Sequence, residues 1–207
     1  MTIYAKRSDV KKILIIFAHP AFQKSRVNAR LIEGLAQMEG ITFHDLYQAY
    51  PEFDIDIAAE QQLLTEHDVI VFHHPFFWYS TPALLKEWQD LVLEHGWAYG
   101  SQGNQLNDKW FFNIITTGGG AAAYSQQGYN FYTIRQLLAP IEQTARLCKM
   151  VFLPPYVVHG THAITPEEIE AYREKGQRLL TMIRDGDFDL AAAMQLQYLN
   201  DYMKRSD

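Results

Sequence analysis

The chain has 207 residues, of which 48% are hydrophobic and 20% are charged, a composition typical of one soluble globular domain. The formal net charge of −6 argues against a nucleic-acid partner, and no Lys- or Arg-rich run predicts a helix on a membrane surface. The single cysteine, Cys148, excludes an intrachain disulfide framework and fits a reducing compartment. We therefore expect a cytoplasmic protein.

Short apolar segments alternate with helical patterns along the chain. Segment 12–18, KILIIFA, is rich in isoleucine without alternation, which is typical of a strand buried on both faces, and it is too short to span a membrane. Further strands are predicted at 41–46, 68–74, 109–117 and 150–158. Helices are predicted at 28–38, 57–66, 81–96, 132–149 and from 165 to about 184.

Several helix boundaries carry local signals. Thr81 and Pro82 predict a hydroxyl cap followed by proline at the first helical position, and Pro140 predicts a kink. Thr165 and Glu168 form a capping box before the last long helix. We expect a single domain over residues 1–186 and a C-terminal extension, residues 187–207, that forms a final helix.

A strand followed by a helix, five times over, predicts an α/β fold: a three-layer sandwich with a five-stranded parallel sheet and helices on both faces. Ligands in such folds bind beyond the carboxyl ends of the strands. That rule points to three loops: HPAFQKSRVN after the first strand, HPFFWYSTP after the third and TTGGGAAAYSQQGYN after the fourth.

The first loop leads into a helix, whose N-terminus offers unpaired N–H groups and positive potential to a phosphate. His19, Ser25 and Asn28 add side-chain donors. Alternatively, Ser25 or Asn28 only caps the helix. Neither GxGxxG nor GxxxxGK[ST] occurs, so the dinucleotide fingerprint and the P-loop NTPase motif are both absent.

The second loop carries four consecutive aromatic residues: Phe76, Phe77, Trp78 and Tyr79. Consecutive positions cannot all point inward, so some of these rings should line a cleft, where they suit a planar heterocycle. His73 and His74 precede them, but no carboxylate or cysteine stands at ligand spacing, and no metal site is predicted.

The third loop is made of small residues: Thr116, Thr117, Gly118 and Gly119. Their backbone can pass close along the edge of a flat ligand, with Tyr124 reaching over it, although glycines after a strand also serve merely to turn the chain. A phosphate at the first loop and a flat ring between the other two describe flavin mononucleotide (FMN) better than a nicotinamide dinucleotide.

The chain resembles the flavodoxin-like NAD(P)H:quinone oxidoreductases in three segments: ILIIFAHPAFQKSRVN, HHPFFWYSTPALLKEWQDLVLEHGWAYG and TTGGGAAAY. The likeness runs from about residue 12 to residue 184. Within that family the chain is most similar to the bacterial glutathione-regulated potassium-efflux system ancillary proteins, through HDLYQAYPEFDIDIAAEQQLL, GWAYGSQGNQLNDK and LPPYVVHG.

The resemblance implies a role for each matching position. The flavin phosphate and ribityl chain would be held by His19, Ser25, Arg26, Val27 and Asn28, with Gln61 as a further contact. The isoalloxazine would be contacted by Phe76, Phe77, Trp78, Tyr79, Thr116, Thr117, Gly118 and Gly119. The catalytic residues would be Tyr124, beside the reactive edge of the flavin, and Asn130, which stands where the animal-type enzymes carry a histidine. A proton relay that needs that histidine is therefore not carried over.

The resemblance further implies bound FMN, with FAD as the alternative, and two-electron transfer from NAD(P)H to a quinone within a homodimer. It also raises a second hypothesis: a regulatory subunit of a potassium-efflux antiporter, held at the inner membrane by that partner. A third, an electron-transfer flavodoxin, is disfavoured because such proteins have a glycine-rich phosphate loop, and HPAFQKSRVN has no glycine.

Overall fold

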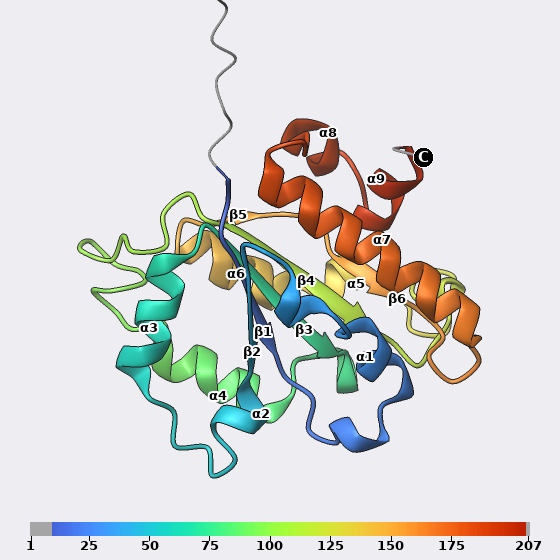
Figure 1. Ribbon diagram of the computed structural model, residues 1–207, viewed down its shortest axis with the longest axis horizontal. Helices are drawn as coiled ribbons and strands as arrows, with labels where there is room; N and C mark the ends of the chain where they lie inside the picture. Colours follow the sequence, from blue (N-terminus) through green and yellow to red (C-terminus); the bar gives the residue numbers. More distant parts are fainter. Residues whose placement is uncertain (1–9, 206–207) are drawn as a thin grey trace, which may run out of the picture.

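The structure, a computed structural model, describes residues 10–205 and shows one layer of parallel strands between helices (Figure 1). The strands lie in the order β2-β1-β3-β4-β5, and β6 also pairs with β4. Every pairing between named strands is parallel, which together with this order confirms the predicted flavodoxin-like α/β fold. The strands are β1 Ile13–Phe17, β2 Ile41–Asp45, β3 Val69–Pro75, β4 Trp110–Thr116, β5 Val151–Phe152 and β6 Tyr156–Val158.

Helices cover both faces of the sheet. They are α1 Arg26–Leu31, α2 Leu46–Ala49, α3 Ile57–Glu66, α4 Ala83–Val92, α5 Ile134–Leu137, α6 Ala139–Leu147, α7 Pro166–Asp185, α8 Leu190–Met194 and α9 Leu199–Arg205. Residues of α3, α4 and α6 bury with one face of the sheet, and residues of α1, α7, α8 and α9 bury with the other. Residues 1–9 of the predicted domain and 206–207 of the predicted extension lie outside the described residues.

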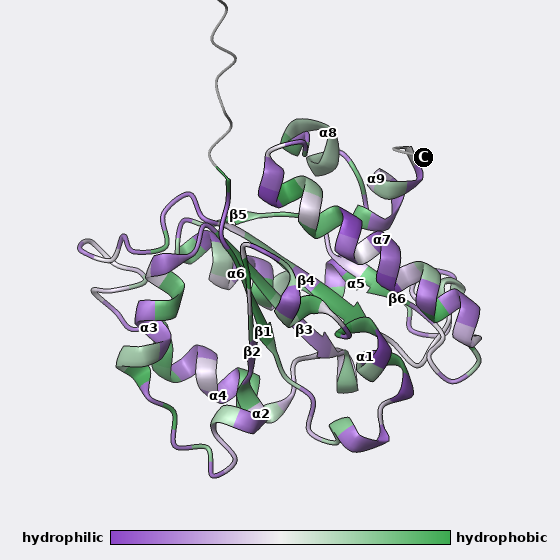
Figure 2. Cartoon of the chain, in the orientation of Figure 1, coloured by the Kyte–Doolittle hydropathy of each residue, from purple (hydrophilic) through white to green (hydrophobic). Residues whose placement is uncertain are grey.

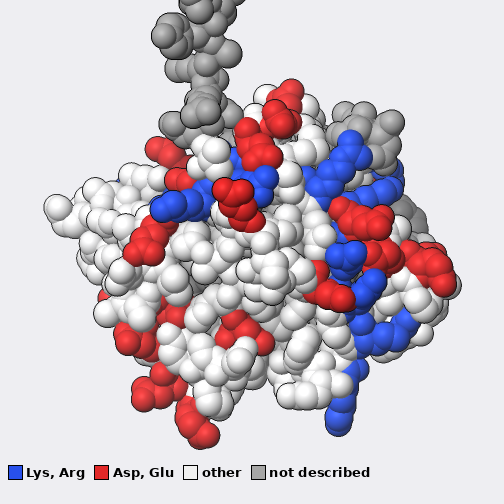
Figure 3. All heavy atoms as spheres, viewed as in Figure 1, with Lys and Arg blue, Asp and Glu red and all other residues white. Residues whose placement is uncertain are grey.

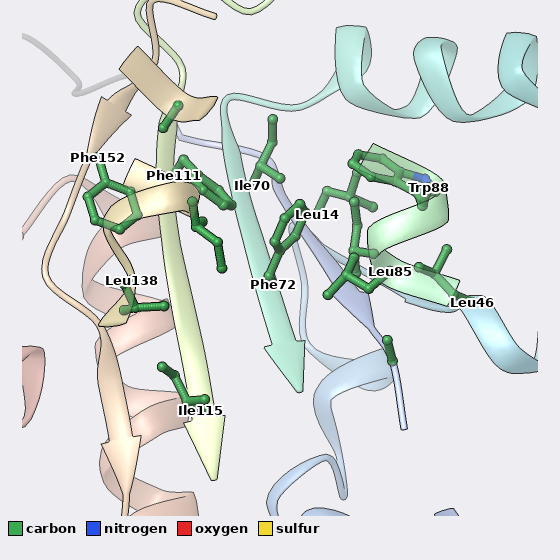
Figure 4. Packing of buried hydrophobic residues seen from close by; sticks show 14 of the residues in the cluster. Leu14, Leu46, Ile70, Phe72, Leu85, Trp88, Phe111, Ile115, Leu138 and Phe152 are labelled. Carbon is green, nitrogen blue, oxygen red and sulfur yellow. The ribbon is translucent and has the colours of Figure 1, made fainter. Parts of the chain in front are cut away.

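The strands are apolar on both sides because both sides are covered. Leu14 and Ile16 of β1 belong to one buried cluster, and Ile13 and Ile15 belong to the other. In Figure 2 the central strands are largely green, the colour of hydrophobic residues, whereas the helices also carry purple, hydrophilic patches. Figure 4 shows Trp88 of α4 against the first cluster, in which the rings of Phe72 and Phe111 meet edge to face with centroids 4.7 Å apart.

The predicted fifth strand is two short strands. Both pair with β4, through Phe111 with Phe152 and through Ile114 with Tyr156. Pro154 and Pro155 separate them, because proline has no N–H group to donate to a sheet ladder. The sheet therefore has six strands in five positions.

Two predicted helices are likewise interrupted. The prediction for 28–38 is wrong beyond α1, because Gly34 adopts a left-handed backbone with φ of 84° before a 3-10 turn. In 132–149 the kink assigned to Pro140 is a break at Leu138, and Pro140 lies in the first turn of α6, where a missing N–H group is tolerated.

Of the two predicted helix caps, one is confirmed and one is wrong. The capping box is confirmed: Glu168 N donates to Thr165 Oγ1 (3.2 Å), and Thr165 N donates to Glu168 Oε2 (2.8 Å). The prediction for α4 is wrong by one position, since Pro82 itself is the N-cap and the helix begins at Ala83. Thr81 Oγ1 is buried and has no hydrogen-bond partner among residues 10–205.

The segment after Gly186 forms α8 and α9 rather than one helix. Leu199 and Met203 are fully buried against the sheet face that α7 covers. Asn200 exchanges two hydrogen bonds with the Val157 backbone (2.8 and 2.9 Å), which fixes α9 beside β6. The division of the chain at residue 186 stays a prediction.

A buried carboxylate on α3 links that helix to β2, to the end of α2 and to α4. Glu60 of α3 is 0% exposed and accepts hydrogen bonds from Trp88 Nε1 (2.7 Å) and Tyr50 Oη (2.6 Å), and its Oε1 lies 2.7 Å from His44 Nε2. Burial by itself would raise the pKa of Glu60, but the bonds from these three partners leave that pKa below its ordinary value.

Candidate functional site

A cleft of about 510 Å³ opens at the carboxyl edge of the sheet, beyond β1, β3, β4 and β6. Its volume lies within the range of small-molecule sites. Nine of the predicted binding residues line this carboxyl-edge cleft: His19, Ser25, Arg26, Val27, Asn28, Phe76, Phe77, Thr116 and Gly118. The three loops chosen from the sequence therefore do meet at one place.

The loop after β1 is tied to the end of β4. Ser25 caps α1, because its Oγ accepts from Asn28 N (3.2 Å) and from Asn28 Nδ2 (3.0 Å). Asn28 Nδ2 also donates to Thr116 Oγ1 (3.1 Å) across the sheet edge. The capping interpretation of Ser25 is thus confirmed, and the side chain lines the cleft as well.

Backbone donors around the cleft lack acceptors. Within residues 10–205, the N–H groups of Arg26, Val27, Gly118 and Gly119 donate to no backbone or side-chain atom. Lys24 also lines the cleft and forms no ion pair with any described residue. The Lys and Arg side chains near α1 and α7 in Figure 3 are, by contrast, mixed with acidic ones, as in the Arg30–Glu170 pair at 2.6 Å. Unpaired N–H groups and a free ammonium fit the phosphate of a flavin nucleotide.

His19 presents a further donor. Ala21 N donates to His19 Nδ1 (3.1 Å), so Nδ1 is the unprotonated nitrogen and Nε2 carries the proton. Burial lowers the pKa of His19, although a backbone hydrogen bond and the Asp45 carboxylate oppose the effect. The imidazole therefore acts as a neutral N–H donor at the cleft wall.

The aromatic loop has one buried anchor and three accessible rings. Phe76 is buried and its N–H donates to Thr116 O (2.9 Å), which joins the second loop to the third. Phe77 lines the cleft edge-on to His19, with ring centroids 5.8 Å apart. Trp78 is 92% exposed, and both Trp78 and Tyr79 have positive φ, a conformation that bulky residues rarely adopt.

The glycine loop lies close to other chain segments. A Cβ atom at Gly118 would stand 2.7 Å from His162 Nε2, and one at Gly119 would stand 3.3 Å from the Tyr124 ring. Tyr124 is buried, and burial raises the pKa of its hydroxyl, so the group is protonated at neutral pH. Tyr79 Oη donates to Asn130 Oδ1 (3.0 Å), which links the aromatic loop to the segment after Tyr124.

Sequence reasoning missed Lys24, Thr161 and His162, all of which line the cleft. Thr161 and His162 follow β6, so applying the carboxyl-edge rule to the last strand would have found them. Arg26 reaches this segment, because its guanidinium donates to Ile164 O (2.7 Å). That residue therefore joins the first loop to the last one.

The structure does not bring Gln61 to the cleft. Its Nε2 donates to Val92 O (3.1 Å) and to Glu94 Oε2 (2.8 Å). Helix α4 runs back from the carboxyl edge of the sheet, so its last residues lie near the amino edge, away from the three loops.

Within residues 10–205, no group of three or more His, Cys, Asp or Glu side chains is arranged to hold a metal ion. His73 is fully buried with neither ring nitrogen bonded to a described group, and burial lowers its pKa to about 3. No helix in this range is both long and apolar enough to cross a bilayer.

Known proteins with the same architecture are similar to this chain in sequence. The model of a family described as having a flavodoxin-like fold matches residues 11–180. The glutathione-regulated potassium-efflux system ancillary protein KefG of Serratia proteamaculans is 48% identical over 165 residues, which cover 80% of this chain and 90% of that protein.

Two solved structures are also similar. General stress protein 14 of Treponema denticola, in complex with FMN, is 36% identical with a TM-score of 0.79 and covers 83% of this chain and 99% of that one. An NADPH-quinone reductase from P. pentosaceus is 30% identical with a TM-score of 0.71 and covers 86% and 98%. The resemblance inferred from the sequence is confirmed. With a match over residues 11–180 and nearly half its aligned residues shared with one relative, this protein belongs to the flavodoxin-like family.

Proposed function

We propose that this protein is an FMN-dependent NAD(P)H:quinone oxidoreductase. One observation carries the proposal: unpaired backbone N–H groups, a lysine without an ion pair and accessible aromatic rings, all judged within residues 10–205, stand at a single cleft at the carboxyl edge of the sheet. That set matches the phosphate and the flat ring of a flavin. The similar protein from T. denticola is described with FMN, and the one from P. pentosaceus as a quinone reductase.

Each wall of the cleft has a separate binding task. Lys24, His19 Nε2 and the N–H groups of Arg26 and Val27 would hold the phosphate. Phe76, Phe77 and the exposed Trp78 would pack against the ring system. The N–H groups of Gly118 and Gly119 would meet the polar edge of the ring system, because glycine has no side chain of its own to block the approach.

Bound FMN would supply two-electron chemistry that no side chain provides. The chain's own task is to stabilise charge and to hold a proton. Preorganised N–H groups at Gly118 and Gly119 suit a developing negative charge. The Tyr124 hydroxyl, kept neutral by burial, is a donor rather than a base at neutral pH.

The first test is the visible absorption spectrum of the purified protein, recorded alone, after NADPH and then after menadione. We expect flavin bands that bleach with NADPH and return with the quinone. A colourless protein that gains no bands on incubation with FMN or FAD would refute the proposal. Bands that do not bleach would retain the cofactor but remove the NAD(P)H activity.

Replacing Trp78 with alanine is expected to weaken FMN retention about tenfold, since a stacking ring contributes roughly 1.4 kcal/mol. Because Trp78 is 92% exposed, the thermal midpoint of the flavin-free protein should not change. Fluorescence titration with FMN measures the first quantity, and calorimetry measures the second.

Leu147→Ala is the matched control for Trp78→Ala. Leu147 is also an exposed apolar residue, 51% accessible, but it ends α6 at the amino edge of the sheet, away from the cleft. FMN affinity should be unchanged in this variant. Equal affinities in both variants would remove Trp78 from the flavin site.

A second function is favoured by the similarity to KefG, described as a potassium-efflux ancillary protein. We propose that the chain also acts as an ancillary subunit of a glutathione-regulated potassium-efflux antiporter, in the cytoplasm or held at the inner membrane by that partner. Potassium efflux from cells that co-express such an antiporter should increase when this chain is present. Unchanged efflux and failure to co-purify would remove this function without affecting the first.

We further propose that the protein works as a homodimer. Six exposed aromatic side chains lie in the loops after β3 and β4, which the Tyr79–Asn130 hydrogen bond joins: Phe77, Trp78, Tyr79, Tyr129, Phe131 and Tyr132. Exposed apolar patches of this kind mark contact surfaces. Light scattering after gel filtration should give twice the mass of the chain, whereas a monomer at working concentration would contradict the proposal.

A further inference from the structure

A second cavity, of about 470 Å³, lies on the sheet face that α7 covers, beside β6. Tyr156 and His159 line it from β6 and the turn that follows, Tyr172 from α7, and Tyr198 and Asn200 from α9 and the turn before it. Because the family match ends at residue 180, the α9 wall belongs to the segment beyond that match. We call this space the α9 cavity.

His159, which lines the α9 cavity, has a ring nitrogen without a hydrogen-bond partner in residues 10–205. Thr117 has a single hydroxyl proton, which it donates to Gly119 O (2.8 Å). Its Oγ1 lies 3.1 Å from His159 Nδ1, so Nδ1 must carry the proton of that bond. His159 Nε2 is then a bare acceptor, and it is buried with no partner within residues 10–205.

The pKa of His159 is consistent with one unprotonated ring nitrogen. Burial lowers the pKa of the imidazole to about 4, so the ring is neutral at pH 7 and one nitrogen is free to accept. A buried acceptor without a donor is unfavourable by more than the net worth of an ordinary hydrogen bond. A ligand that brings an O–H or N–H group would relieve this.

The walls define the rest of the ligand. Four charged residues line the cavity, Glu168, Lys175, Asp201 and Lys204, two of each sign, and Lys204 pairs with Asp201 at 2.8 Å. Such a balance favours no net ligand charge. The three tyrosine rings offer flat apolar surface, which suits a planar molecule.

We propose that the α9 cavity is a second small-molecule site, which takes an uncharged planar aromatic alcohol whose hydroxyl group donates to His159 Nε2. Nε2 is buried in the structure, so this binding mode requires a wall side chain to move, and the partly buried Tyr198 ring beside the imidazole is the one that we propose turns aside. That ring stands edge-on to the imidazole, with centroids 6.0 Å apart. The α9 cavity shares no lining residue with the carboxyl-edge cleft, although His159 packs against Tyr124 with ring centroids 5.6 Å apart, and this proposal does not depend on the flavin proposal.

Calorimetric titration tests the proposal with two probes, 1-naphthol and 1-methoxynaphthalene, which differ in the hydroxyl proton. Excess FMN is present to occupy the cleft, and a protein that does not retain FMN is titrated alone. We expect the naphthol to bind about tenfold more tightly, the worth of one hydrogen bond. In His159→Phe the two probes should bind alike, because the acceptor nitrogen is gone while an aromatic ring is kept.

A pair of α7 variants locates the site. Ala171 lines the cavity and is exposed, so Ala171→Trp should fill it and abolish binding of both probes. Glu174 lies about one turn further along α7 and outside the cavity lining, so Glu174→Trp should leave binding unchanged. Equal affinity of the two probes for the unmodified protein, or naphthol binding that survives Ala171→Trp, would overturn the proposal.

Discussion

Replacing Glu60 with alanine is expected to lower the free energy of unfolding by about 3–5 kcal/mol, because the change leaves buried donors without an acceptor. The Trp88 indole N–H and the Tyr50 hydroxyl both donate to this carboxylate, and His44 lies within bonding distance of it. A void left beneath α4 adds to the loss. Urea denaturation followed by circular dichroism measures it.

Glu66→Ala is the matched control for Glu60→Ala. Glu66 lies on the same helix but is exposed, and its substitution should change stability by less than about 0.5 kcal/mol. A loss below about 1 kcal/mol in Glu60→Ala would show that the network contributes little.

The pH dependence of stability gives an independent check on Glu60. Its folded-state pKa lies below the ordinary value of 4.5, so its contribution is fully present above that value and is lost as pH falls through the folded pKa. Glu60→Gln lacks this titration. The stability difference between the two proteins should therefore shrink on acidification, and a constant difference would contradict the assignment.

Replacing Tyr124 with phenylalanine is expected to lower quinone turnover by on the order of 10²-fold, the usual effect of removing one preorganised donor. FMN retention should stay the same, because the ring that packs 5.6 Å from His159, between centroids, is kept. Steady-state rates with NADPH and menadione, normalised to bound flavin, measure the effect.

Tyr129→Phe is the matched control for Tyr124→Phe. Tyr129 lies in the same connection and is 85% exposed, so loss of its hydroxyl should leave turnover unchanged. Normal turnover in Tyr124→Phe would remove the catalytic role of that hydroxyl, while leaving the flavin site itself intact.

Local sequence signals were sufficient wherever the physical cause is local. The isoleucine-rich β1 is buried on both faces, as its pattern predicts, and the capping box at Thr165 begins α7. Residues without an N–H group or with free φ also act locally, yet Pro154, Pro155 and Gly34 interrupt elements that hydrophobic pattern alone continues. Breaker residues should therefore be given more weight than periodicity in such segments.

The position of the candidate site was predictable from the sequence, but the contacts of individual side chains were not. The carboxyl-edge rule brought together three loops that are far apart in the chain, since parallel strands all end at one edge. It could not exclude Gln61, whose amide bonds to Val92 and Glu94 only once α3 lies beside α4. It also could not show that the buried Glu60 is paired, because the partners Tyr50 and Trp88 come from other elements.

The sequence by itself determined the parallel α/β architecture and the edge of the sheet at which the cleft opens, because strand burial and strand direction follow from residue pattern and chain order. Only the tertiary structure decided which polar atoms are satisfied. The N–H groups of the cleft and Nε2 of His159 are unpaired because no segment within residues 10–205 places a partner beside them. Hydrogen bonding between distant segments depends on distances of a few ångströms, which no periodicity encodes.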